Sequence, residues 1–96
     1  MRKIAVAGEL GWASPGTTYD IAPLELYYLR ATVFEGRTNP RRATRTIYFL
    51  CVHGSFEADV NGKKVKVEEG ELLEINQGEE YYNNARERAV VVVLEP

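Results

Sequence analysis

FEADVNGKKVKV, residues 56–67, is the stretch that decides the fold. Apolar residues alternate with acids over residues 56–60, and valines alternate with charged residues over residues 64–68. A period of two is typical of a strand that buries one face. Between the two runs stands Asn61-Gly62, which tolerates the two positive φ angles of a type I′ turn, and the twist of that turn matches the flanking strands. The stretch therefore predicts a β-hairpin.

Four further segments on either side of the hairpin are short and rich in β-branched and aromatic residues, which favours strands. Turn-forming glycines stand between them, at close to the roughly 8–12-residue spacing of a sandwich or barrel. No window keeps the apolar period of a helix for three turns, so we expect at most one short helical turn. The sequence therefore predicts an all-β domain. The four segments are 25–34, 44–52, 72–75 and 89–94.

Two of these segments, 44–52 and 89–94, are apolar on both faces instead of alternating. A strand that is buried on both faces lies between two layers of structure. A barrel built from 96 residues has no second layer of its own, so a second copy of the chain would have to supply it. We therefore expect a homodimer.

The composition fits one soluble globular domain. The 96 residues carry a formal net charge of −2, and 45% of them are hydrophobic and 27% charged. A chain of this length buries about 60–65% of its unfolded surface, which is enough for one core and excludes a two-domain enzyme. The negative net charge and the lack of an evident basic face argue against a nucleic-acid partner.

Targeting segments are also expected to be absent. No stretch approaches the roughly 18 consecutive apolar residues that a membrane-spanning helix needs. The N-terminal run turns polar at Gly8-Glu9, too early for the apolar region of a signal peptide. The single cysteine, Cys51, excludes an internal disulfide and fits a reducing compartment. We therefore expect a cytoplasmic protein with no membrane partner.

The whole chain is expected to form a single domain, in which residues 1–24 are an arm packed on a barrel made by residues 25–96. Ile4 and Val6 alternate and predict one edge strand within the arm. Trp12 is expected to pack against the barrel as an apolar plug.

The spacing of the glycines and strands resembles the cupin superfamily. Residues 52–62 (VHGSFEADVNG) resemble the glycine-flanked hairpin of the first cupin motif, and residues 67–75 (VEEGELLEI) resemble the strand of the second. Residues 76–81 stand where the family has P-x-G-x-x-H. The resemblance covers roughly residues 33–95 and implies a small, single-domain, double-stranded β-helix, or jelly-roll barrel, that often dimerises.

The resemblance also implies where a metal-binding cupin places its ligands, which are two histidines and a glutamate before the first glycine and a third histidine after the second motif. None of the corresponding residues here supplies the imidazole, thiolate or carboxylate that such metals prefer. We therefore expect no metal, no cofactor and none of the family's metal-dependent activities. The corresponding positions are Arg41, Ala43 and Ile47 when counted back from Gly54, Arg42 and Thr44 when counted forward from Gly36, and Tyr81 in the second motif.

Arginines are the most informative candidate binding residues. Arg41, Arg42 and Arg45 precede and enter the strand that lines the pocket in the resembling family. An inward guanidinium would bind a carboxylate or phosphate through its two-point fork. The alternative is a solvated strand edge, where positive charge discourages edge pairing. Phe49 and Tyr81 would complete a pocket for a small anion that is partly aromatic or sugar-like.

His53 is the only histidine and stands directly before Gly54. It is interpreted as a residue at the rim of the barrel, although an imidazole can also titrate near neutral pH and serve as an acid or base. The candidate ligand-binding set is therefore Arg41, Arg45, Phe49, His53 and Tyr81, with no residue assigned to catalysis.

Three functions stay open. The preferred one is a metal-independent module that binds a small molecule, and the alternative is a cupin-type enzyme, such as a sugar or sugar-phosphate isomerase, that uses His53 or Tyr81 as its acid or base. The third is a structural dimer whose barrel is filled by its own side chains. An open barrel mouth with inward arginine and tyrosine favours binding, a cavity-facing His53 near a carboxylate favours the enzyme, and a plug of Ile47, Phe49 and Leu73 favours the structural dimer.

Overall fold

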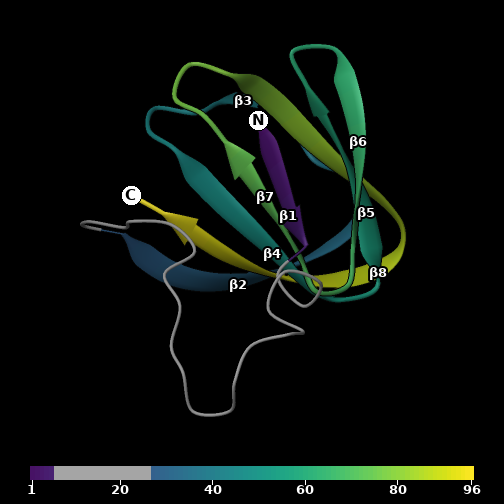
Figure 1. Ribbon diagram of the computed structural model, residues 1–96. Coiled ribbons are helices and arrows are strands. Elements are labelled where there is room, and N and C mark those ends of the chain that lie inside the picture. Colours follow the sequence, from purple (N-terminus) through teal and green to yellow (C-terminus); the bar gives the residue numbers. More distant parts are fainter. Residues whose placement is uncertain (6–26) are drawn as a thin grey trace.

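The computed structural model describes residues 1–5 and 27–96, which form eight strands (Figure 1). Within these ranges there is no helix, and therefore none long and apolar enough to cross a membrane. The strands are β1 (Arg2–Ala5), β2 (Tyr28–Arg37), β3 (Arg41–Arg42), β4 (Ile47–His53), β5 (Ser55–Val60), β6 (Lys63–Glu68), β7 (Glu71–Ile75) and β8 (Glu80–Glu95).

The strands pair antiparallel in the order β1-β7-β4-β8-β5-β6, and β2 and β3 also pair with β8. The central element is β8, which has 16 residues. Its C-terminal half lies between β4 and β2, whereas its N-terminal half pairs with β5 and β3. The strand therefore passes from one layer to the other, along the curved path seen in Figure 1. The prediction of an all-β jelly-roll barrel is confirmed.

The predicted hairpin is present as β5 and β6. Ala58 lies opposite Val65, and both central residues of the turn have positive φ, with 51° at Asn61 and 84° at Gly62. The N–H of Gly62 donates to Asp59 Oδ1 over 3.0 Å, which ties the turn to the strand before it. A type I′ turn needs this pair of angles, and asparagine and glycine are the residues that adopt them most readily.

The predicted strand 89–94 is too short, because β8 begins at Glu80. Its first half alternates as strictly as a strand should, with Tyr81, Asn83 and Ala85 buried. The inward residue in the middle of this run is an asparagine, so hydrophobicity alone does not reveal the alternation. The short bridge β3, which pairs with this half of β8, was not predicted either.

Aromatic rings occupy the centre of the barrel. Phe34, Phe49 and Phe56 come from β2, β4 and β5, and their ring centroids lie 6.0, 5.1 and 6.3 Å apart in tilted or edge-on pairs, the arrangement that aromatic quadrupoles favour. Leu73 and Ile75 of β7 belong to the same cluster and are fully buried. The barrel interior is therefore filled over most of its length by its own side chains.

The outer face of β4 is partly buried as well. Tyr48 packs with Ile4 of β1 and Leu72 of β7 in a second, smaller cluster. Within the described residues β1 pairs only with β7, so the predicted edge strand is present at Ile4. Val6 and most of the arm predicted over residues 1–24 lie outside the described residues.

Candidate functional site

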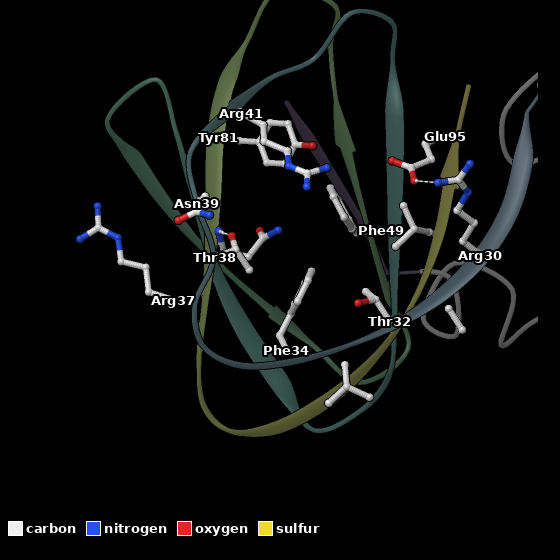
Figure 2. A pocket seen from close by; sticks show the side chains of 14 residues that line it. Arg30, Thr32, Phe34, Arg37, Thr38, Asn39, Arg41, Phe49, Tyr81 and Glu95 are labelled. Atoms are coloured by element: carbon white, nitrogen blue, oxygen red, sulfur yellow. Dashed lines mark hydrogen bonds and ion pairs between the residues drawn. The ribbon is translucent and has the colours of Figure 1, made fainter.

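A pocket opens at one end of the barrel, between β2, β3, β4 and β8 (Figure 2). Its volume is about 550 Å³, within the size range of small-molecule sites. Phe34, Phe49 and Val93 provide an apolar wall that continues into the core. Polar side chains from β2, β3 and β8 line the rest, and these decide what the pocket can bind.

Arg41 is the pocket's free cation. It lies directly opposite Tyr81 in the pairing of β3 with β8, and opposed residues project from the same face of a sheet. Figure 2 shows both side chains directed over the pocket. Among the described residues Arg41 forms no ion pair, whereas its neighbour Arg42 faces the other way and pairs with the carboxylate of Glu80.

Tyr81 stands between this cation and the aromatic wall. Its side chain is buried, and its ring meets the Phe49 ring at 62°, with the centroids 5.8 Å apart. Burial raises the pKa of the Tyr81 hydroxyl above its usual value of 10.0, the Arg41 charge partly opposes this increase, and the Glu95 carboxylate adds to it. The hydroxyl is therefore protonated at neutral pH and can both donate and accept a hydrogen bond.

Asn83 supplies a polar group that has no partner. Its residue is 2% exposed, and its Oδ1 atom is buried without a hydrogen bond to any described residue. The backbone holds it in place, because Asn83 N–H donates to Thr38 Oγ1 over 2.9 Å and Thr38 N–H donates to Asn83 O over 2.8 Å. Leaving a buried acceptor unpaired costs about 1–3 kcal/mol, which a ligand donor in the pocket would recover.

The other charged groups at the pocket are already engaged. Arg30 and Glu95 form an ion pair with 3.0 Å between Nη1 and Oε1, drawn as a dashed line in Figure 2. The guanidinium of Arg37 stacks 4.2 Å from the Tyr82 ring centroid, and Figure 2 shows it pointing away from the pocket. Arg41 is thus left as the lining charge without a protein counter-ion among the described residues.

Two predicted site residues lie elsewhere. Arg45 is outside the pocket lining, and its guanidinium lies 5.6 Å from the centroid of the Tyr27 ring. His53 lies at the end of β4, where its Nδ1 is 3.3 Å from Glu69 Oε1 and it lines a separate hollow of about 800 Å³. The structure therefore brings Arg41, Phe49 and Tyr81 together and places Arg45 and His53 apart from them.

Comparison with known proteins supports the fold. No protein-family model and no curated protein matches the sequence. Among solved structures, a cupin-2 domain protein from Shewanella frigidimarina superposes with a TM-score of 0.71 at 18% identity, covering 97% of this chain and 93% of that one. A cupin superfamily protein from Desulfitobacterium hafniense gives 0.68 at 9% identity, covering 77% and 70%. The cupin domain of Schizosaccharomyces pombe Cnp3 gives 0.60 at 15% identity, covering 77% and 58%.

The chain has a cupin fold. The likeness in sequence is below 25% in each case, so the comparison supports the architecture alone and leaves the function to the chain's own residues.

The inward side chains of this cupin barrel do not fit a metal ion. The register counted back from Gly54 leads to Ala43 and Ile47, and both are buried in the core together with Tyr81. None of these side chains, nor Arg41 beside them, is a ligand for a divalent metal. Within residues 1–5 and 27–96, no group of three or more His, Cys, Asp or Glu could hold one.

The Tyr81 environment gives a pH-dependence that can be measured. Because the folded pKa of Tyr81 lies above its unfolded value, the stability contributed by its neutral hydroxyl is present below about pH 10 and is lost as the pH rises toward the folded pKa. We expect Tyr81→Phe to lose less stability than the wild type when urea unfolding is repeated across this alkaline range. Equal alkaline losses in both proteins would show that the hydroxyl is not desolvated.

Proposed function

We propose that this chain is a metal-independent module that binds a small carboxylate in the pocket at the barrel end. One observation carries the proposal: an arginine without a counter-ion and a buried amide oxygen without a partner face the same pocket. A guanidinium binds a carboxylate through two parallel hydrogen bonds, and it does so more strongly where apolar walls exclude water. The aromatic rings beside Arg41 supply such a wall.

The enzyme alternative rests on His53 and its carboxylate neighbour Glu69. Their side chains are 73% and 62% exposed, so water surrounds and screens the pair. His53 and Tyr81 also line different hollows, so they are not placed to act on one substrate as acid and base. The geometry therefore favours binding over this isomerase-type chemistry.

The barrel filled by its own side chains is realised only in part. Ile47, Phe49 and Leu73 are all buried in the core, as this alternative requires. They leave the barrel end open, and Phe49 itself forms part of the pocket wall. A structural role for the filled interior and a binding role for its open end are compatible.

We further propose that the module works as a homodimer through the outer face of β2, β8 and β4. Leu29, Val33 and Val52 are 73%, 42% and 48% exposed, unusually high fractions for large apolar side chains. Leu29 and Val33 lie opposite Leu94 and Val90 of β8, so the exposed residues form one continuous apolar surface. Such a surface favours a protein partner, and the molecular mass in solution tests whether that partner is a second copy.

The binding proposal is tested with protein freed of metal by a chelator and checked by elemental analysis. Calorimetric titrations with D-gluconate and with hexanoate, two carboxylates of the same chain length, are expected to give saturable binding of at least one acid. Binding that disappears with the metal and returns with Mn²⁺, Fe²⁺, Ni²⁺ or Zn²⁺ would contradict the proposal. So would the absence of binding by either acid.

A further inference from the structure

The charge of the pocket specifies the charge of its ligand. Arg30 and Glu95 neutralise each other, and Arg37 is stacked on Tyr82 away from the opening. Arg41 therefore leaves the lining with one uncompensated positive charge among the described residues. A ligand with one negative charge matches it. A dianion would leave its second charge near the Glu95 carboxylate, and a zwitterion would bring an ammonium group for which no free acid remains.

The hydrogen-bonding groups specify a donor on the same ligand. The Oδ1 atom of Asn83 is an acceptor, and a carboxylate cannot satisfy it because an ionised carboxylate only accepts. The ligand must bring an O–H or N–H group to this point. Thr32 and Tyr81 line the same pocket, and their hydroxyls can pair with ligand hydroxyls in either sense.

The strand geometry specifies the distance between the two ligand groups. Tyr81 and Asn83 are successive inward residues of β8, and Arg41 lies opposite Tyr81. Residues two apart in a strand are separated by about 7 Å, a distance that a chain of about five or six carbons spans. The carboxylate at Arg41 and the donor at Asn83 therefore belong to opposite parts of a ligand of this length.

We infer that the ligand is a monoanionic hydroxycarboxylate of about sugar-acid size, with its carboxylate on Arg41 and a hydroxyl on Asn83. This inference rests on the proposed function and narrows it, because a carboxylate alone would satisfy Arg41 and leave Asn83 unpaired. Asn83 is then the residue that determines specificity, and Arg41 the residue that determines affinity for the charge.

Three probes of equal chain length separate these contributions. D-gluconate carries both the carboxylate and the hydroxyls, hexanoate carries only the carboxylate, and D-glucitol carries only the hydroxyls. We expect gluconate to bind at least about tenfold more tightly than hexanoate, and glucitol to bind most weakly, because a buried acceptor left unpaired penalises hexanoate. Calorimetry on the full chain measures all three.

A matched pair of variants assigns the difference to one residue. Asn83→Ala is expected to lower gluconate affinity about tenfold and to leave hexanoate within about twofold, whereas Asn84→Ala, on the neighbouring outward residue, changes neither. The thermal unfolding midpoint without ligand shows whether each variant folds. It is expected to be unchanged or higher in Asn83→Ala, because that variant removes an unpaired buried group.

Each outcome decides something definite. If hexanoate binds as tightly as gluconate, or if Asn83→Ala weakens both acids equally, the inference is wrong while the proposed carboxylate site stands. If neither acid binds, the proposed function itself is wrong.

Discussion

Arg41→Gln is expected to weaken carboxylate binding by about 10- to 100-fold, while Arg42→Gln leaves it within about twofold. Hydrogen bonds to a charged group contribute about 1.5–3 kcal/mol, and glutamine keeps a donor at the site but removes the charge and the two-point fork. The measurement is calorimetric titration of wild type and both variants with D-gluconate at low ionic strength.

Arg42 is a matched control because the same substitution is made one residue along the same strand. Its guanidinium donates to Gly78 O over 2.9 Å and to the Glu80 carboxylate, on the face of the sheet away from the pocket. Equal losses in the two variants would mean that the acid responds to the general positive charge of this edge. The site would then lie outside the pocket.

Gly54→Ala is expected to lower the free energy of unfolding by about 3 kcal/mol, which corresponds to a fall of about 12–24 °C in the unfolding midpoint of a domain of this size. Gly54 has a φ of +80°, in the region where an L side chain costs about 1–2 kcal/mol. A Cβ there would also lie 3.0 Å from Arg88 O and 3.3 Å from Ala89 Cα. Both are backbone atoms of β8, so the new methyl group can be accommodated only by moving the strand.

Gly62→Ala separates the two causes. Gly62 has nearly the same φ, +84°, but a Cβ there would meet nothing within 4 Å, so only the conformational cost of about 1–2 kcal/mol applies. Urea unfolding of both variants measures the difference. Equal losses would show that β8 yields to the methyl group and that the close approach of Gly54 to β8 adds no stability.

Local sequence pattern predicts the parts of this fold whose contacts are local. The hairpin of β5 and β6 follows from alternation and from Asn61-Gly62, both of which lie within a few residues. The first half of β8 escapes prediction because its inward residue, Asn83, is polar and its partners in β2, β3 and β5 are distant in sequence. Its charged outward residues strengthen the impression of a loop.

The candidate site divides in the same way. The motif register that resembles the cupins places Arg41 and Tyr81 on inward positions, and the strand pairing puts them opposite each other. Asn83 and Glu95 have no local signal, because they meet the pocket only through the long path of β8 between its two layers. Arg45 and His53 fall outside the pocket because each lies at or near an end of β4, where the chain turns away from it.

Arg41 also explains how a cupin barrel without metal ligands can attract an anion. The residue stands at one of the positions where the motif register places a ligand histidine, and it brings a permanent positive charge to the pocket. A guanidinium keeps that charge at every physiological pH, so anion binding here is expected not to depend on any metal.

The measurement that tests the central claim most directly is a titration of the metal-free, ¹⁵N-labelled protein with D-gluconate, followed by two-dimensional NMR. The account predicts that the largest shifts fall on the backbone amides of Arg41, Phe49, Tyr81 and Asn83 and on the side-chain amide of Asn83. Shifts that instead centre on the hollow beside His53, Arg86 and Arg88, or that appear only after a divalent metal is added, would contradict it.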